Sequence, residues 1–482
     1  MPKRPSREKP NERKGSADLS DPPPKNKKKR KQDIFIIIEQ PPTDPPVEEL
    51  FQELLIGELP KELPKEEIPE PHKKIQPAIA LTKKELTYFK KLSIDQQEVL
   101  NSYMQSLNSF TDNSDIPLKF RILSLPVSDY IKSSVLKKVQ MLEDDSGEHH
   151  KIKNWVDAFL RLPFGKTIPL PVSLETGKEK CSEFLQDSRR ILDTAVYGMH
   201  NAKTQIMQVI SQWIANPESV GNVIALQGPA GVGKTSIARN GIAKALCRPF
   251  EFFSLGGASD VATYTGHSYT YEGSMWGRIA DSLMHSKCMN PVLYFDELDK
   301  ISGTPHGEEI ASMLIHLTDR SQNSQFHDRY FSGIDLDVSQ CLFVFSFNDI
   351  SLVNPILRDR MQVIHCGGYS QKEKQTILED YVWPDLLKRL KFDPKDILLG
   401  ESSKFLISEY SSKEEGVRTL IRTAEMLITR LNMLRIANEE TMKDYKFYLK
   451  VEFPLELNIT KIRKLLFDLG QKEPELWRAM YN

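Results

Sequence analysis

The distribution of apolar residues along the chain separates regions with different periods. Beyond residue 221, short apolar runs at 223–226, 250–255, 292–295 and 342–347 alternate with longer segments, such as 236–246, that have helical spacing. Uninterrupted apolar runs of this length are typical of strands buried on both faces, and intervening helical segments favour parallel strands. The pattern predicts an α/β fold with a parallel sheet that is covered by helices on both faces.

Helical spacing dominates on either side of this region. Residues 86–107 and 127–142 carry apolar side chains at helical intervals, and the pattern becomes mostly helical again after Pro384. Residues 40–80 are rich in Pro, Glu and Lys, which disfavours helix. We therefore predict four parts: a disordered basic tail and linker at 1–85, a helical N-terminal region at 86–175, the α/β domain at 176–383, and a small helical lid domain with a short tail at 384–482.

Charge is balanced over the whole chain but not along it. The 482 residues carry a formal net charge of −1, so any attraction to nucleic acid has to be local. Residues 1–33 contain 12 Lys and Arg against 5 Asp and Glu, a composition that predicts disorder. The basic run from Lys25 to Lys31 suits nuclear import or contact with nucleic acid, and it equally suits a solubilising tail.

Patterns for export and for membrane insertion are not recognisable. No window approaches the roughly 18 uncharged apolar residues that a membrane span needs, and charged residues and prolines follow Met1 without the apolar segment of a signal peptide. The five cysteines are scattered and form no CxxC pair, so neither a disulfide framework nor a zinc site is indicated. We predict a soluble intracellular protein, cytoplasmic or nuclear, that is not secreted and does not enter a membrane.

A glycine-rich segment lies between the first apolar run and the helical segment after it. It matches the pattern G-x-x-x-x-G-K-[ST] and reads Gly228-Pro229-Ala230-Gly231-Val232-Gly233-Lys234-Thr235, followed by Ser236. Glycines let backbone N–H groups turn inward around a phosphate, which also faces the positive end of the next helix. Lys234 would reach the outer phosphates, and the Thr235 hydroxyl would bind Mg²⁺. The segment predicts a site for ATP with Mg²⁺.

Polar residues at the ends of two later strands complete the predicted site. Asp296 and Glu297 follow the apolar run 292–295, and Asn348 follows the run 342–347. Asp296 would hold Mg²⁺ through water, while Glu297 would orient and polarise the water that attacks the phosphate. Asn348 could position the same water, and a purely structural polar residue is an equal alternative there.

Longer strings stand on both sides of the P-loop segment Gln227–Ser236. They are Asp193-Thr194-Ala195-Val196-Tyr197-Gly198, Ser254-Leu255-Gly256-Gly257, Gly266-His267, Tyr271-Glu272-Gly273-Ser274-Met275-Trp276-Gly277-Arg278-Ile279, Asn290-Pro291-Val292, Asp296-Glu297-Leu298-Asp299-Lys300, Asp359-Arg360-Met361-Gln362-Val363-Ile364 and Gly416-Val417-Arg418. In this order, the strings and the P-loop resemble the AAA+ ATPase module of the Lon protease family, which usually has a second proline at the place of Ala230. The resemblance extends from about Phe89 to about Gly470.

The resemblance implies roles that spacing alone does not assign. Tyr197 would lie against adenine, Asn348 would take the sensor-1 place, and Arg418 would take the sensor-2 place in the lid domain. Arg360 matches the arginine finger that reaches into a neighbouring subunit's site, with Arg358 as a second candidate. The alternative for each arginine is a surface salt bridge. A finger that acts between subunits implies a homo-oligomeric ring, and rings of this family are hexamers.

The same resemblance places Tyr271 at the aromatic pore-loop position, which grips an unfolded polypeptide in the family. Glu272 replaces the usual apolar neighbour and would have to lose its water against each passing side chain, which weakens the grip. The alternative is that Tyr271 is simply a packed loop aromatic.

Two parts of Lon proteases are not recognisable in these 482 residues. The family carries a serine–lysine peptidase domain after the small helical domain, whereas most residues after Arg418 would complete the helical domain itself. The remainder is too short for a further domain, which needs at least about 50 residues. The large N-terminal substrate-recruiting domain is not recognisable either. We therefore expect an ATPase without peptidase activity in this chain.

The leading hypothesis is a Lon-like AAA+ ATPase that couples ATP hydrolysis to protein unfolding or remodelling in protein quality control, alone or with a peptidase on another chain. A nucleic-acid-associated AAA+ ATPase is one alternative, motivated by the run from Lys25 to Lys31. It predicts ATPase stimulation by DNA or RNA that falls steeply with salt. A regulatory protein that binds ATP and turns it over slowly is the other alternative.

Overall fold

The computed structural model describes residues 76–77, 81–110, 116–143, 149–217, 222–258, 260–271 and 273–469. The predicted tail, including the basic run from Lys25 to Lys31, lies outside the described residues, as does Glu272. Within the described ranges, no helix combines the length and the apolar character that crossing a membrane requires.

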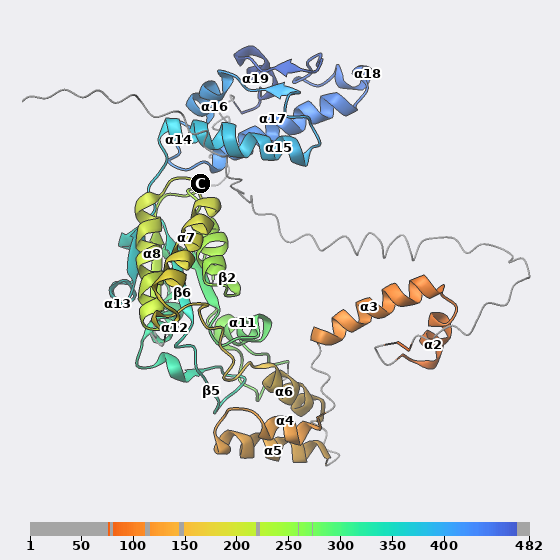
Figure 1. Cartoon of the computed structure of the whole chain (residues 1–482), viewed down its shortest axis with the longest axis vertical. Helices are drawn as coiled ribbons and strands as arrows, with labels where there is room; N and C mark the ends of the chain where they lie inside the picture. The colour runs from red at the N-terminus through yellow and green to blue at the C-terminus, as the bar shows by residue number, and fades with distance from the viewer. Residues whose placement is uncertain are drawn as a thin grey trace, which may run out of the picture. The chain divides into compact units, whose positions relative to one another are not determined.

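A five-stranded parallel sheet forms the centre of the α/β domain (Figure 1), which confirms the predicted fold class. In spatial order its strands are β2 (Phe250–Ser254), β3 (Val292–Asp296), β6 (Leu342–Phe347), β1 (Asn222–Gln227) and β7 (Gln362–His365). The edge strand β7 is not among the predicted runs. Only Ile364 of its four residues is buried, so its apolar signal is weak.

The order of the strands brings three chain segments to one edge of the sheet. β6 lies between β1 and β3, and Gln227 at the end of β1 stands opposite Phe347 at the end of β6. The carboxyl ends of parallel strands share one edge, where ligands bind in open α/β sheets. Accordingly, the backbone N–H of Gly228 donates to the carbonyl of Phe347 at 3.2 Å. The P-loop, Asp296 and Asn348 are therefore neighbours because of topology.

Alternate residues of each strand enter two different apolar cores. On β1, Ile224 and Leu226 belong to one core, and Val223 and Ala225 belong to the other. Two long helices, α7 and α8, lie side by side over the first face (Figure 1). Burial on both faces explains why the strands are apolar throughout rather than alternating.

The helices of the α/β domain fall into two sets. The first face packs against α7 (Lys178–Ala195), α8 (His200–Ala215) and the π-helical η2 (Ile237–Ala243), which continues the short helix α9 (Lys234–Ser236). The second face packs against α10 (Ala262–Thr265), α11 (Arg278–Ser286) and α12 (Pro305–Thr318). Shorter elements are η1 (Leu174–Thr176), η3 (Leu298–Lys300), η4 (Asn323–Gln325), β4 (Phe326–His327), β5 (Asp335–Leu336), η5 (Ile350–Leu352) and α13 (Pro355–Asp359).

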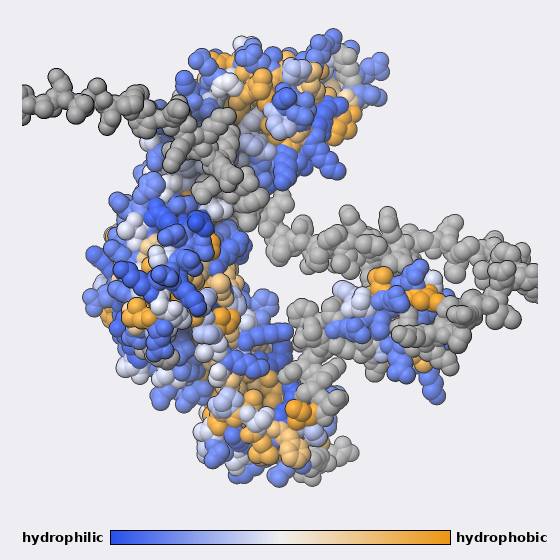
Figure 2. Space-filling view, in the orientation of Figure 1, coloured by the Kyte–Doolittle hydropathy of each residue, from blue (hydrophilic) through white to orange (hydrophobic). Residues whose placement is uncertain are grey.

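Helices precede the α/β domain, as the spacing predicted. They are α2 (Lys83–Phe89), α3 (Ile94–Phe110), α4 (Leu118–Leu123), α5 (Asp129–Glu143) and α6 (His149–Arg161). Trp155 and Phe159 of α6 are buried in the same core as the second face of the sheet. On α4, by contrast, Phe120 and Leu123 are at least half exposed, and Figure 2 shows apolar surface over α4 and α5.

The C-terminal part is mostly helical, and it has its own apolar core. Its elements are α14 (Gln371–Thr376), η6 (Ile377–Val382), α15 (Trp383–Arg389), β8 (Ile397–Leu398), α16 (Ser402–Tyr410), α17 (Arg418–Ile436), α18 (Glu439–Met442), β9 (Leu455–Glu456) and α19 (Ile459–Leu465). The first three follow one another without a break and span residue 384. The boundary predicted at 384 thus falls inside helical structure, and the domain division stays a prediction.

Candidate functional site

A cleft of about 640 Å³ opens at the carboxyl edge of the sheet. It brings together most of the predicted site residues, from both the α/β domain and the lid: Tyr197, Ala230, Gly231, Val232, Gly233, Lys234, Thr235, Ser236, Asp296, Glu297, Asn348 and Arg418. Gly228 and Pro229 lie at the base of the same loop, and their carbonyls contact the Lys234 ammonium. Arg358 and Arg360 are not among the residues that line the cleft.

The P-loop is shaped by backbone that only glycine adopts easily. Gly233 has a φ of 101° and immediately precedes the helix that starts at Lys234. The Lys234 ammonium donates to the carbonyls of Gly228 and Pro229 at 2.7 and 3.0 Å and to Oδ1 of Asn348 at 2.7 Å. Burial lowers the pKa of Lys234 below its usual value. The loop lysine and the predicted sensor-1 residue are therefore in direct contact.

Oxygen ligands suited to Mg²⁺ lie together beside the P-loop. The Thr235 hydroxyl is 3.1 Å from the Tyr294 hydroxyl, which in turn donates to Oδ1 of Asp296 at 3.3 Å. The Ser346 hydroxyl also donates to this carboxylate. Burial raises the pKa of Tyr294, so the phenol stays a proton donor. A hydroxyl and a carboxylate held in this way fit a hard cation, although the sequence did not reveal Tyr294 or Ser346.

The predicted catalytic carboxylate, Glu297, sits at a conformationally unusual position. Glu297 has a φ of 59°, in the left-handed region, directly after β3. Its side chain lies against Gly256, which lies in the loop that follows the neighbouring strand β2. A Cβ atom on Gly256 would come within 2.0 Å of Oε2 of Glu297. The absence of a side chain at Gly256 thus leaves room for the carboxylate.

Gly256→Ala should lower kcat for ATP hydrolysis by about tenfold, because Glu297, the predicted general base, would be displaced and lose its alignment with water. The clash involves the far end of a flexible side chain, so the thermal unfolding midpoint and the affinity for ATP should not change. Steady-state ATPase rates and nucleotide titrations measure both. Gly303→Ala is the matched control, because a Cβ there meets no atom within 4 Å. Equal rates for the two variants would contradict the spatial role of Gly256.

Asp299 holds the loop that carries Asn348. Its Oδ2 accepts hydrogen bonds from the backbone N–H groups of Asn348 at 3.1 Å and of Asp349 at 3.2 Å. Asp299 is 6% exposed, and its Oδ1 has no hydrogen-bond partner among the described residues. A buried carboxylate that accepts two backbone donors fixes their position strongly. The sequence placed Asp299 only in a family string and assigned it no role.

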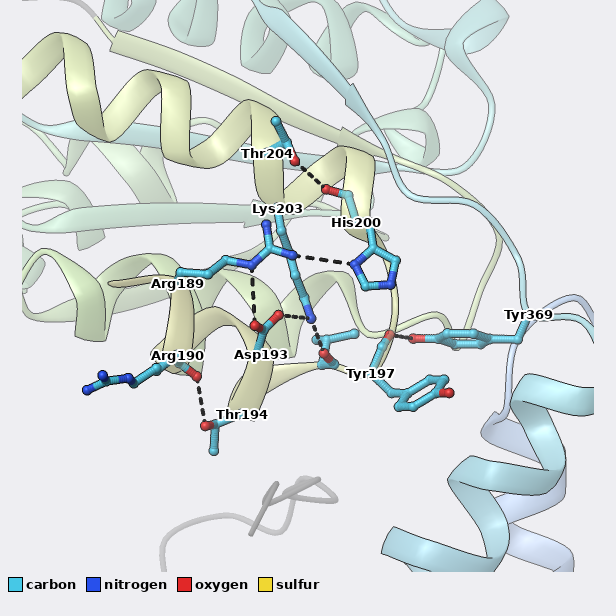
Figure 3. A network of polar contacts seen from close by, with 10 residues as sticks. Arg189, Arg190, Asp193, Thr194, Tyr197, His200, Lys203, Thr204 and Tyr369 are labelled. Carbon is cyan, nitrogen blue, oxygen red and sulfur yellow. Dashed lines mark hydrogen bonds and ion pairs between the residues drawn. The ribbon is translucent and has the colours of Figure 1, made fainter. Parts of the chain in front are cut away.

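A polar network supports the backbone at Tyr197 (Figure 3). The buried ammonium of Lys203 donates to Oδ1 of Asp193 at 2.9 Å and to the carbonyl of Val196 at 2.6 Å. Burial lowers the pKa of Lys203, and the hydrogen bond to Asp193 opposes that shift. The Tyr197 ring lies 5.7 Å from the ring of Tyr381, centroid to centroid. The end of α7 is thereby fixed where Tyr197 enters the cleft.

The lid contacts the P-loop through direct hydrogen bonds. The backbone N–H of Val417 donates to the carbonyl of Gly231 at 3.1 Å, and Arg418 begins α17 at the next position. Tyr369, in the segment between β7 and α14, also contacts the P-loop, and its hydroxyl donates to the carbonyl of Val232 at 2.9 Å. Burial raises the pKa of Tyr369, which keeps this donor protonated. Tyr369 lines the cleft but is embedded in no recognisable motif, so sequence reasoning missed it.

Arg360 is engaged at a different surface. Its guanidinium pairs with Asp319 at 2.9 Å and donates to the carbonyl of Ile315 on α12. Arg358 lies in α13, two residues earlier. Neither arginine lines the cleft of its own subunit, and their roles stay predictions. Tyr271 is 69% exposed, which does not favour the alternative of a packed loop aromatic.

The fold and the cleft define a P-loop ATPase of the AAA class. Residues 224–368 match the family described as "ATPase family associated with various cellular activities (AAA)". This segment runs from β1 to just beyond β7 and includes the P-loop, the acidic pair and Asn348.

Lon proteases are similar to this chain over a longer stretch. A Lon protease homolog of Acanthamoeba polyphaga mimivirus is 33% identical over 354 residues, which cover 71% of this chain and 34% of that protein. The Lon protease of Chlamydia pneumoniae is 31% identical over 403 residues, 79% and 47% of the two chains. A mitochondrial Lon protease homolog of Schizosaccharomyces pombe is 35% identical over 316 residues, 65% and 28%.

Over these residues the ATPase module of this chain is similar to that of Lon proteases. The chain carries a Lon-type AAA+ module and spans less than half the length of each of these three relatives.

Proposed function

We propose that this chain hydrolyses ATP in order to unfold or remodel protein substrates, and that it works as a homo-oligomeric, hexameric ring. The observation that carries the proposal is the convergence of Lys234, Thr235, Asp296, Glu297 and Asn348 in one cleft. Phosphate-binding, metal-binding and water-activating groups are the parts that phosphoryl transfer to water requires.

Each residue of the cleft has a distinct task in this proposal. The triphosphate would bind the backbone N–H groups of the P-loop and the Lys234 ammonium. Mg²⁺, held by Thr235 and through water by Asp296, would neutralise charge on the phosphate oxygens. Glu297 would accept a proton from the attacking water, and Asn348 would orient that water.

The remaining residues would connect the site to its surroundings. Arg418 begins the lid helix α17 and lines the cleft, so it would report the state of the nucleotide to the lid. Arg360 lies outside its own cleft and would stabilise charge in a neighbour's site. A contact of this kind, repeated head to tail, forms a ring where the rotation between neighbouring subunits closes. The exposed Tyr271 would grip the polypeptide.

The test is an ATPase assay of the purified chain alone, with an unfolded protein such as casein, and with DNA. We expect casein to stimulate hydrolysis severalfold and DNA to leave it unchanged, with Lys234→Ala inactive throughout. Stimulation by DNA that falls steeply with salt would instead support the nucleic-acid-associated alternative. An ATPase rate that neither casein nor DNA stimulates would contradict a motor whose hydrolysis is coupled to substrate.

The same samples test whether the chain cleaves peptides. Casein should remain intact on a gel during ATP hydrolysis, and ATP-dependent degradation that is lost in Lys234→Ala would contradict this expectation. The cytoplasmic or nuclear location expected for this chain also stays a prediction. The names of relatives include mitochondrial and chloroplastic forms.

A further inference from the structure

The loop that carries Tyr271 is pinched at its base. It leaves α10 and returns to α11, and the backbone N–H of His267 donates to the carbonyl of Met275 at 3.0 Å. Gly277 closes the loop so tightly that a Cβ there would come within 2.1 Å of the Tyr264 carbonyl. The fully buried carboxylate of Asp328 accepts from the Gly277 N–H at 2.8 Å. The two ends of the loop are thus fixed to the α/β domain.

The segment of the loop before Tyr271 contacts side chains from the N-terminal helices. Lys138 of α5 lies 4.6 Å from the ring centroids of both Trp155 and Tyr269. Lys151 of α6 lies 4.7 Å from the Tyr269 centroid and donates to the carbonyl of Thr270 at 3.3 Å. An ammonium at this distance from an aromatic ring is attracted to its face. Lys138 therefore holds Tyr269, and Lys151 holds both Tyr269 and Thr270, the two residues that immediately precede Tyr271.

The segment of the loop after Tyr271 contacts α6 as well. Arg161, at the end of α6, lies 5.8 Å from the Trp276 ring centroid. Trp276 also meets the ring of Tyr330 edge-on, with 5.7 Å between centroids. Trp155 anchors α6 in turn, because it is buried and donates to the carbonyl of Tyr330 at 3.1 Å. Helix α6 thus touches the loop on both sides of its exposed tip.

We propose that α5 and α6 position the Tyr271 loop for substrate, so that the N-terminal helical region is part of the apparatus that grips an unfolded polypeptide. This inference rests on the proposed function. A loop that pulls on a substrate has to transmit force rather than bend. Because Lys138 and Lys151 lie over the Tyr269 ring, they would resist bending of the loop close to Tyr271. Lys138 and Lys151 are positioning residues for Tyr271.

The test replaces both clamp lysines in the full chain with methionine, which keeps the apolar stem and removes the charge. Lys138→Met with Lys151→Met should lower casein-stimulated ATPase and the unfolding rate of a tagged substrate by about fivefold. Basal ATPase and the thermal unfolding midpoint should not change. Lys137→Met with Lys153→Met is the matched control, since both are exposed lysines on the same two helices. Arginine at 138 and 151 should restore stimulation, because it also binds aromatic faces.

Tyr271→Ala separates the failure of this inference from the failure of the proposed function. If Tyr271→Ala keeps full casein stimulation, the loop does not grip substrate, and the proposed function and the inference fail together. If Tyr271→Ala loses stimulation while the methionine pair keeps it, the inference alone is wrong. Basal ATPase that falls in the methionine pair would also overturn it, because the lysines would then act on hydrolysis itself.

Discussion

Glu297→Gln should lower kcat for ATP hydrolysis by about 10²- to 10³-fold while ATP still binds, because an amide cannot take a proton from the attacking water. The substitution preserves the shape of the side chain and leaves the P-loop and the proposed Mg²⁺ ligands, Thr235 and Asp296, intact. Steady-state phosphate release measures kcat, and titration with a fluorescent ATP analogue measures binding. Size-exclusion chromatography with ATP should show a ring that persists, because the nucleotide is bound but not turned over.

Lys234→Ala provides the contrasting control for this experiment. It removes the charge that is proposed to contact the phosphates and should abolish ATP binding together with hydrolysis. A Glu297→Gln variant that hydrolyses ATP as fast as the wild type would remove Glu297 from the catalytic role. Unchanged activity in cells would favour the regulatory ATP-binding protein over a motor.

Asp299→Ala should lower kcat by about 10- to 100-fold, because Asp299 lines the cleft beside Asn348 and holds its backbone in place. The substitution removes the acceptor of the Asn348 and Asp349 N–H groups. The Asn348 amide would then lose the position from which it contacts Lys234 and orients water. Asp299→Asn should lose less, because its amide oxygen can still accept from the backbone. ATPase rates measure the effect, and thermal unfolding shows how much of it reflects lost stability.

A double-mutant cycle with Asn348→Ala distinguishes positioning from general destabilisation. If Asp299 acts through Asn348, then Asp299→Ala should cause little further loss of kcat in the Asn348→Ala background. Equal losses in both backgrounds would show that Asp299 acts independently of Asn348, and the proposed chain of contacts would be wrong.

Most residues of the cleft could be predicted from the sequence, because they belong to short motifs whose residue types and spacing are local. A phosphate-binding loop requires glycines and a lysine at fixed spacing between a strand and a helix, and the segment from Gly228 to Thr235 satisfies this locally. Asp296 and Asn348 were predictable for a related reason. Each follows an apolar run, and parallel strands end at a common edge.

Residues that act through contacts between distant segments were not predictable in this way. Gly256 and Glu297 meet only because β2 and β3 are neighbours in register. Val417 of the lid and Tyr369, which lies between β7 and α14, meet the P-loop only through the tertiary fold. Strand β7 escaped detection because an edge strand of four residues buries too little apolar surface to leave a clear pattern.

By itself, the sequence determined the fold class and the likeness to the Lon ATPase module, and it predicted the residues that line the cleft, because residue type and spacing decide local structure. The tertiary structure alone decided which groups converge: Asp299 behind Asn348, Gly256 beside Glu297, and Lys138 and Lys151 over Tyr269. Such pairs are set by how whole elements pack against one another, and packing depends on the sum of many contacts that no short stretch of sequence contains.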